Sequence, residues 1–339
     1  MKISIGYEIQ GGPWGGGNNF VSSLTDYLLV NGNKVINHLN DNDIDIILII
    51  DPRRNNPAVT FSSRDIIRYL SKKNNHTIVV HRINECDERK NTKTMNMRLK
   101  LINYISDHTI FIGSWLKDLD LWNPFLNESS VILNGADRCI FNMNNKEPWN
   151  TNEELRLVTH HWAGNEMKGF DVYSKIDDMV ATEKWNKKIS FTYIGNLPKG
   201  FKFKKSFYFP PMQGKKLADE LKKNHVYITG SVNEPAGMHH IEGAMCGLPI
   251  LYRNSGSLPE YCSSFGLEFT LESLASDINR IIMKYDEYFL KMPKYPYHSD
   301  LMCNQYLKLF NDLYKDKESI IKRRFVRKNY FYNAVNKIL

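Results

Sequence analysis

Apolar positions in the first half of the chain alternate between short continuous runs and longer segments with helical spacing. The short runs have strand length and lie at 2–6, 44–50, 77–80, 109–112 and 131–133. After the first of them, apolar residues recur at helical spacing at Phe20, Leu24, Tyr27 and Leu28. Buried strands that alternate with helices predict a parallel sheet covered on both faces.

A second alternating series follows in the other half of the chain. Its strands are predicted at 155–159, 189–194, 226–228 and 248–252, and its helices near 170–180, 214–223 and 237–246. Between the two series, apolar periodicity disappears over the polar stretch 144–152. The sequence therefore predicts an α/β protein with a second doubly wound sheet.

The domain boundary is expected in that polar stretch, because 339 residues exceed what one hydrophobic core usually organises. The first Rossmann-like domain is predicted over 1–148, joined by carboxy-terminal helices over about 306–339, and the second over 149–305. Ligands of doubly wound sheets bind outside the carboxyl ends of the strands. The two domains are accordingly expected to face each other across a cleft that holds a shared site.

Apolar runs and cysteine spacing indicate the cellular location of the protein. No apolar run approaches the ~20 residues that cross a bilayer, and the first residues lack the pattern of a signal peptide. The five cysteines are scattered and form no C-x-x-C pair, which disfavours a disulfide framework and a zinc site. These features favour a reducing, cytoplasmic location.

The net charge of +8 favours anionic partners. No nucleic-acid-binding motif accompanies the charge, so a nucleic-acid partner is disfavoured. The densest basic segment is 322–328, and it precedes the aromatic run 330–332. Two interpretations stay open: an amphipathic helix that packs its aromatics on the protein, which is favoured, or peripheral contact with anionic lipid.

The most informative segment runs from Gly230 to Pro249 and has the pattern strand, sharp loop, helix, strand. Pro235 suits the first turn of a helix, and Gly237 allows backbone N–H groups to approach a ligand closely. Glu234 precedes this helix and Glu242 lies within it. The pattern predicts an anion site, suited to a diphosphate, with two carboxylates that can contact hydroxyl groups of one ligand.

This segment resembles the donor motif of the retaining family-4 glycosyltransferases, which have the GT-B fold of two Rossmann-like domains. Two glutamates separated by seven residues match Glu234 and Glu242, and the sequence at 244–249 follows in register. The turn at 255–260 resembles the Gly-Gly-x-Pro-Glu turn of that family. The resemblance implies that Glu234 holds hydroxyls of the donor sugar and that Glu242 holds the ribose.

Three further landmarks occur in the order that this family shows. They are the turn 134–137, the pair Lys168-Gly169, and the glycine loop before the helix that contains Phe20. The resemblance implies that Lys168 contacts the donor diphosphate. It also places donor-binding residues in the glycine loop and at the start of the donor helix, namely Gly15, Gly16, Gly17, Gly237, Met238 and His239.

The sequence departs from the family pattern at the second diphosphate-binding cation. Where the family has an arginine, this chain has His160-His161-Trp162. His161 is the candidate replacement, acting as a protonated ring or as a neutral hydrogen-bond donor. His81, placed at the carboxyl end of the strand predicted over 77–80, matches a family histidine that faces the donor sugar, although a structural role is an equal alternative.

A metal site is not predicted. Asp43-x-Asp45 and Asp118-x-Asp120 imitate a metal-binding signature, but such a short pattern recurs by chance. His239 and His240 have no further metal-ligand spacing nearby, so we interpret them as local hydrogen-bonding residues. Neither a metal nor a cofactor is expected beyond the donor substrate itself.

The resemblance implies glycan biosynthesis by metal-independent transfer of a sugar from a nucleoside-diphosphate sugar to an acceptor hydroxyl, with retention of configuration. The acceptor class stays open among glycan, lipid-linked and small-molecule acceptors. The expected catalytic residues are Glu234, Lys168 and His81. The alternatives are a sugar-nucleotide epimerase or hydrolase of the same fold, and a catalytically silent nucleotide-sugar-binding module.

Overall fold

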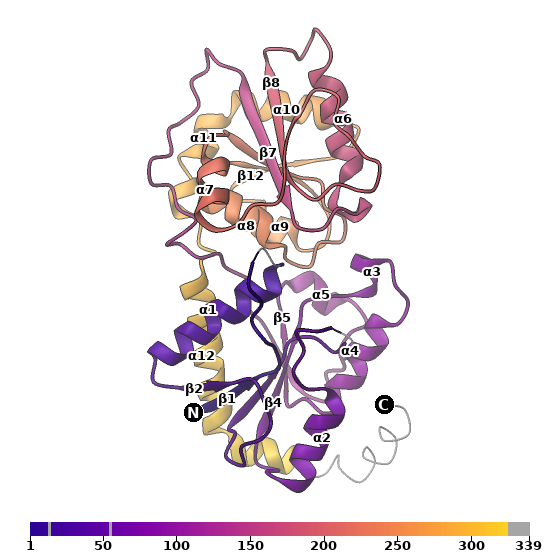
Figure 1. Ribbon diagram of the computed structural model, residues 1–339, viewed down its shortest axis with the longest axis vertical. Helices are drawn as coiled ribbons and strands as arrows, with labels where there is room; N and C mark the ends of the chain where they lie inside the picture. The colour runs from indigo at the N-terminus through magenta and orange to yellow at the C-terminus, as the bar shows by residue number, and fades with distance from the viewer. Residues whose placement is uncertain (13–14, 54–55, 325–339) are drawn as a thin grey trace. The chain divides into compact units, whose positions relative to one another are not determined.

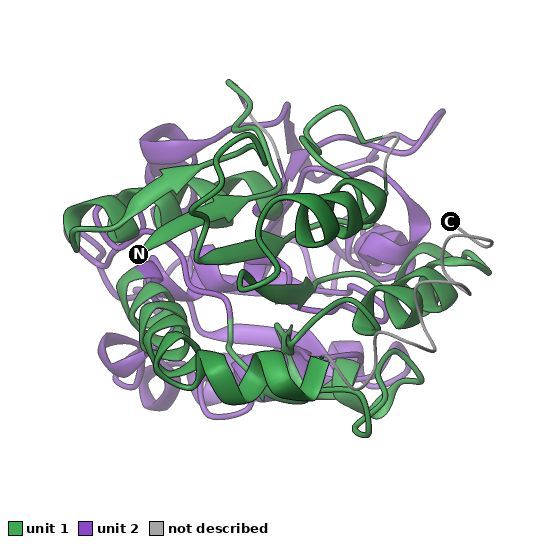
Figure 2. Cartoon of the chain, turned by 90° about the horizontal axis from the view of Figure 1, so that it is seen from below, with its two compact units in different colours: residues 1–11, 17–133, 300–339 green, residues 12–16, 134–299 purple. Residues whose placement is uncertain are grey.

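The computed structural model describes residues 1–12, 15–53 and 56–324. The chain divides into two compact units, coloured separately in Figure 2. Unit 1 contains Met1–Gly11, Gly17–Leu133 and the chain from Asp300 onward, and unit 2 contains Gly12–Gly16 and Asn134–Ser299. Unit 1 is thus assembled from both ends of the chain.

Unit 1 is built on a six-stranded sheet in the order β2-β1-β3-β4-β5-β6, with every neighbouring pair parallel. The strands are short, and the central strands β3, β4 and β5 are fully buried, as expected for a sheet covered on both faces. Their bounds are β1 Lys2–Ile5, β2 Lys34–Ile36, β3 Ile46–Ile49, β4 Ile78–Ile83, β5 His108–Phe111 and β6 Glu128–Val131.

Helices cover both faces of this sheet (Figure 1). Ile46 and Leu48 of β3 pack with α1 (Gly16–Val30) and α12 (Ser299–Lys315), whereas the intervening Ile47 packs with α2 (Ser63–Lys72) and α4 (Met95–Asn103). This alternation follows from the two-residue repeat of a strand. The shorter helices of unit 1 are α3 (Asp87–Lys90) and α5 (Ser114–Asp118).

Unit 2 is built on a second parallel six-stranded sheet, in the order β12-β11-β10-β7-β8-β9. Its central strands β7, β8 and β10 are composed mainly of buried apolar and aromatic residues. The bounds are β7 Leu155–His161, β8 Ile189–Gly195, β9 Phe207–Phe209, β10 Val226–Thr229, β11 Ile250–Arg253 and β12 Gly266–Phe269.

One face of this sheet packs on α6 (Phe170–Val180), α10 (Leu274–Met283) and α11 (Tyr285–Phe289). Val226 and Ile228 of β10 point into that core, whereas the intervening Tyr227 lies against Gly243 of α8 (Met238–Met245) on the other face. The remaining helical segments are α7 (Gly214–Lys222), α9 (Leu258–Cys262), and the 3₁₀ turns η1 (Glu166–Lys168) and η2 (Met292–Lys294).

The predicted α/β class and the two doubly wound parallel sheets are confirmed. Apart from the short segment 12–16, the chain passes between the units at 133/134 and 299/300, whereas the sequence predicted 148/149 and 305/306. Residues 134–148 belong to unit 2 because their side chains bond to it. For example, Lys146 Nζ donates to the Asn224 carbonyl at 2.6 Å.

Among the residues that the structure describes, no helix is long and apolar enough to cross a bilayer. The basic segment 322–328 and the aromatic run 330–332 lie mostly or wholly outside the described residues, which end at 324. The cytoplasmic location and the peripheral lipid contact therefore stay predictions.

Candidate functional site

The strand order of unit 2 places a topological switch point between β7 and β10. These strands are neighbours, yet the chain proceeds from β7 to β8 and β9 on one side and from β10 to β11 and β12 on the other. In such sheets ligands bind outside the carboxyl ends of the strands at the switch point. Here those ends are His161 and Thr229.

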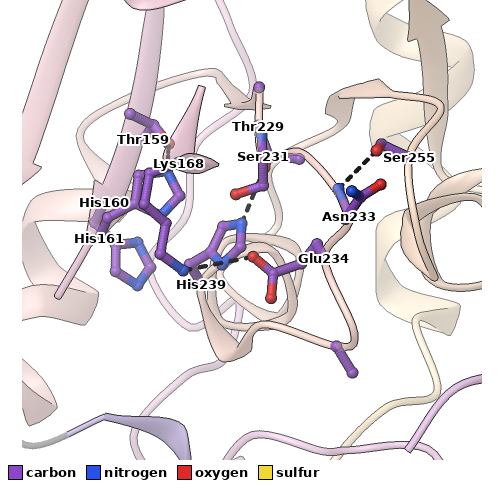
Figure 3. Close-up of polar contacts among 12 residues, drawn as sticks. Thr159, His160, His161, Lys168, Thr229, Ser231, Asn233, Glu234, His239 and Ser255 are labelled. Carbon is purple, nitrogen blue, oxygen red and sulfur yellow. Dashed lines mark hydrogen bonds and ion pairs between the residues drawn. The ribbon is translucent and has the colours of Figure 1, made fainter. Parts of the chain in front are cut away.

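The loop after β10 brings Glu234 to this point, and a neighbouring turn fixes its backbone. The Ser257 N–H donates to the Glu234 carbonyl at 2.8 Å. The Asn233 N–H donates to Ser255 Oγ at 2.7 Å (Figure 3). Gly256 has φ +65°, and a Cβ atom there would lie 2.4 Å from the Glu234 carbonyl oxygen. The turn at 255–260 therefore holds the backbone of Glu234 in place.

The helix that follows begins at Met238 with Gly237 as its N-cap residue. Pro235, expected in its first turn, lies in the preceding loop instead. A Cβ atom at Gly237 would lie 2.3 Å from His239 Nδ1 and 3.0 Å from Glu234 Cδ, so only glycine fits. The first backbone N–H groups of α8 lack partners within the helix, and such groups bind anions.

Lys168 is brought to the same loop from η1. Its Nζ lies 3.5 Å from Glu234 Oε2, and the two side chains are only 17% and 5% exposed (Figure 3). The chain leaves η1 through Gly169 with φ +93°. The Val232 N–H donates to the Met167 carbonyl at 2.9 Å, which ties η1 to the loop after β10. The ammonium and the carboxylate are thus held together beside the start of α8.

Glu242 has a different partner. His160 Nε2 lies 2.7 Å from Glu242 Oε2, and both side chains are at most 10% exposed. Tyr227 lies on the other side of the imidazole, with its hydroxyl 3.2 Å from His160 Nδ1. Three elements, β7, β10 and α8, therefore contribute one polar side chain each to a connected network.

His161 and His239 pack against each other near the ends of β7 and β10, with ring centroids 4.5 Å apart and ring planes tilted by 56°. His239 Nε2 lies 2.9 Å from Thr229 Oγ1, and His161 Nε2 lies 2.6 Å from the Tyr173 hydroxyl. Burial, reinforced by His161 and then His240, keeps the pKa of His239 well below its usual range. His239 is therefore neutral near pH 7 and can contribute a hydrogen bond but no positive charge.

The glycine loop predicted to border the site has two different environments. Gly16 belongs to unit 2, and a Cβ atom there would lie 2.7 Å from Met238 Cγ, at the start of α8. A Cβ atom at Gly15 or Gly17 would meet nothing within 4 Å, and Gly17 lies within α1. A side chain at Gly16 would therefore require the Met238 side chain to move, whereas space is open at its two neighbours.

His81 lies in unit 1 and has no exposed surface. The prediction of a strand end at this residue is wrong, because β4 continues to Ile83 and His81 pairs with Ile49 and Thr109 in the neighbouring strands. Neither ring nitrogen has a hydrogen-bond partner among the described residues, and burial lowers the pKa to about 3. The histidine is neutral near pH 7.

The described residues contain no group of three or more histidine, cysteine or carboxylate side chains arranged to hold a metal ion. In the two Asp-x-Asp segments, Asp43 pairs with Lys2 and Asp120 with Lys100. These carboxylates therefore have lysine partners in unit 1. His240 packs edge-on against Tyr261, with ring centroids 5.2 Å apart.

Motif spacing predicted Glu234, Lys168, His239 and Glu242 as site residues. It did not single out His160, Tyr227 or Tyr173. Tyr227 and Tyr173 lie inside apolar segments, β10 and α6, where an aromatic ring is easily taken for a core residue. Their phenolic groups are the available signal, because a buried hydroxyl needs a partner. His160 was visible only as a neighbour of His161.

Comparison with known proteins assigns the fold. No protein-family model matches the sequence, and no curated protein matches it. Solved structures do match: the two parallel sheets with flanking helices are those of the GT-B glycosyltransferase fold.

The solved structures that match have low sequence identity to this chain. Sucrose-phosphate synthase from Thermosynechococcus elongatus has a TM-score of 0.64 at 14% identity, covering 93% of this chain and 98% of that one. Anabaena HepE in complex with UDP has a TM-score of 0.65 at 11% identity, covering 92% and 100%. A glycosyltransferase from Rickettsia africae has a TM-score of 0.62 at 12% identity, covering 93% and 98%. At such identities the likeness shows the fold.

Proposed function

We propose that this protein is a glycosyltransferase that moves a sugar from a nucleoside-diphosphate sugar to an acceptor hydroxyl, with retention of the anomeric configuration. The observation that carries the proposal is the convergence of Lys168, Glu234 and the start of α8 at the switch point of unit 2. A cation and free backbone N–H groups suit a diphosphate, and buried carboxylates beside them suit the hydroxyls of a sugar and a ribose.

The chemistry follows from where charge develops. As the bond between the sugar and the diphosphate breaks, negative charge accumulates on the leaving phosphate oxygen. Lys168 and the first N–H groups of α8 stabilise that charge from fixed positions, which is the largest contribution in many enzymes. The neutral His239 adds hydrogen bonding without charge. The metal-independent mechanism belongs to this proposal, with no cofactor beyond the donor.

Three further candidates, Glu234, Glu242 and His161, have roles in this proposal. Glu234 binds donor-sugar hydroxyls close to the ammonium of Lys168, and Glu242 binds the ribose. His161, held by Tyr173, is the hydrogen-bonding group near the site of the family arginine. Uridine is the first nucleotide to test, because the HepE structures contain UDP and UDP-glucose.

The test is a thermal-shift and turnover screen of UDP, GDP, ADP, CMP and their common sugar conjugates. Wild type is compared with Glu242→Ala and with Glu183→Ala, an exposed glutamate of the same unit. We expect one nucleotide to stabilise wild type and Glu183→Ala but not Glu242→Ala. A wild type that none of these ligands stabilises would contradict the proposal.

Two further measurements separate the alternatives. Consumption of the sugar nucleotide without any acceptor indicates an epimerase or a hydrolase, and binding without consumption in the presence of acceptors indicates a silent module. NMR of the transferred anomeric centre tests retention. A product with inverted configuration would exclude the retaining mechanism while leaving the donor site in place.

A further inference from the structure

The hydrogen-bond network around Glu242 fixes its carboxylate in one orientation. His160 Nε2 lies 2.7 Å from Glu242 Oε2, and both of these side chains are buried. The other carboxylate oxygen makes no hydrogen bond to the described residues. One oxygen is therefore committed to the protein and the other is available to a ligand.

The positions of the protons in this network follow from the acceptor at its end. An ionised carboxylate can only accept, so His160 Nε2 must carry a proton. In a neutral imidazole Nδ1 is then an acceptor for the Tyr227 hydroxyl at 3.2 Å, and the His160 carbonyl at 3.3 Å is a second acceptor for the same hydroxyl. Burial raises the pKa of Tyr227 well above its usual range, so its hydroxyl keeps that proton.

Tyr227 is itself held from two sides. The His160 backbone N–H donates to its hydroxyl at 3.0 Å, which orients the hydroxyl hydrogen toward another acceptor. Its ring lies directly on α8, since a Cβ atom at Gly243 would be 2.2 Å from the ring atom Cδ2. The residue after Glu242 thus packs on the same tyrosine that orients the histidine partner of Glu242.

We propose that Tyr227 and His160 are positioning residues that hold Glu242 to accept hydrogen bonds from the ribose hydroxyls of the donor, so that this chain distinguishes ribonucleotides from 2′-deoxyribonucleotides. The inference rests on the proposed function. A carboxylate held at one oxygen cannot rotate to suit a sugar with one hydroxyl fewer. The missing hydroxyl therefore leaves a desolvated, charged acceptor without a partner, which is costly.

The experiment measures binding of UDP, GDP, ADP and CMP, each paired with its 2′-deoxy form, by calorimetry. For the base that binds, wild type is expected to prefer the ribose form by about tenfold or more. His160→Leu and Tyr227→Phe are expected to reduce this ratio severalfold, whereas His160→Gln keeps a donor and retains most of it. A purely structural role would weaken both ligands of a pair equally and leave their ratio unchanged.

Tyr285→Phe is the matched control, because Tyr285 is a buried tyrosine of the same unit whose hydroxyl accepts from the Trp149 N–H at 3.2 Å. The ratio of its affinities for the ribose and 2′-deoxyribose forms should equal that of wild type. A folded His160→Leu variant with an unchanged ratio overturns the inference, as does a wild type that binds both forms equally. A wild type that binds none of these pairs overturns the proposed function and the inference together.

Discussion

Gly169 and Gly230 pack backbone against backbone: a Cβ atom at Gly169 would lie 2.3 Å from the carbonyl carbon of Gly230. This contact sets the distance between the turn that carries Lys168 and the loop that follows β10. Gly169 also has φ +93°, which side chains rarely tolerate. We predict that Gly169→Ala lowers the free energy of unfolding by more than about 2 kcal/mol and weakens nucleotide binding.

The matched control for that substitution is Gly200→Ala. Gly200 has a similar backbone conformation, φ +80°, but nothing lies within 4 Å of a Cβ atom there. Urea denaturation of this variant should show only the backbone cost, about 1 kcal/mol, with normal nucleotide binding. Equal losses in the two variants would show that the contact with Gly230 is unimportant.

Acid should destabilise unit 1 through His81. Its pKa is about 3 in the folded protein because the ring is buried, and about 6.5 in an unfolded chain. Below pH 6.5 the unfolded chain therefore binds a proton that the folded protein does not, and stability falls as pH falls toward 3. Between pH 7 and pH 5 this histidine should remove about 2 kcal/mol.

Urea denaturation of wild type and His81→Phe at both pH values checks this expectation, with the variant losing less stability on acidification. His76→Phe alters an exposed histidine of the same unit and should retain the wild-type pH dependence. If His81→Phe and wild type lose the same stability, the buried ring does not account for the acid sensitivity.

A buried amide organises part of unit 1. Asn127 Oδ1 accepts from Trp122 Nε1 at 2.7 Å and from Thr109 Oγ1 at 3.0 Å, while its Nδ2 donates to the carbonyls of Asn103 and Ser106. Asn127→Leu would leave several of these groups buried without a partner. We predict a loss of about 3 kcal/mol, measured by denaturation.

Asn31→Leu is the corresponding surface change, because Asn31 Nδ2 makes an exposed hydrogen bond to the Tyr27 carbonyl at 2.8 Å. Its cost should stay below about 1 kcal/mol. A similar small cost for Asn127→Leu would mean that water or local rearrangement satisfies the network.

Removal of the Lys168 ammonium should weaken binding at the proposed donor diphosphate site. Because Lys168 is largely buried beside Glu234, Lys168→Ala leaves that carboxylate without its cation and next to the bound phosphates. We expect nucleotide affinity to fall by about tenfold or more and turnover to fall further. Lys223→Ala, an exposed lysine of the same unit paired with Glu220, should behave as wild type. Unchanged binding and turnover in Lys168→Ala would contradict the proposed mechanism.

The long periodic elements were predictable from the sequence. Helix α6 has the bounds that the apolar spacing indicated, and β1, β3, β7, β8 and β10 lie within two residues of their predicted ranges. The edge strands β2 and β9 were missed because they have three residues each and are largely exposed, so no buried pattern marks them. Helix α12 begins seven residues before its predicted start, since its first turns carry polar residues among the apolar ones.

Candidate residues were predictable where a motif fixes their spacing along one segment. Glu234, Gly237 and Glu242 lie close in sequence, so their proximity follows from a loop and one helix. The partnership of His160 with Tyr227 spans 67 positions and depends on which strands become neighbours. Strand order is a property of the folded sheet and cannot be predicted from local periodicity.

The assembly of unit 1 from both ends of the chain has a consequence during synthesis. All of unit 2, its short segment 12–16 included, has been synthesised once the ribosome has passed Ser299. The apolar face of α1 is covered only after α12 has been synthesised, because Phe20 packs against Tyr306 of α12 with ring centroids 5.1 Å apart. The nascent chain therefore carries an uncovered hydrophobic surface while nearly three hundred residues are made, and premature stop codons after Ser299 should yield aggregation-prone protein even though unit 2 is intact.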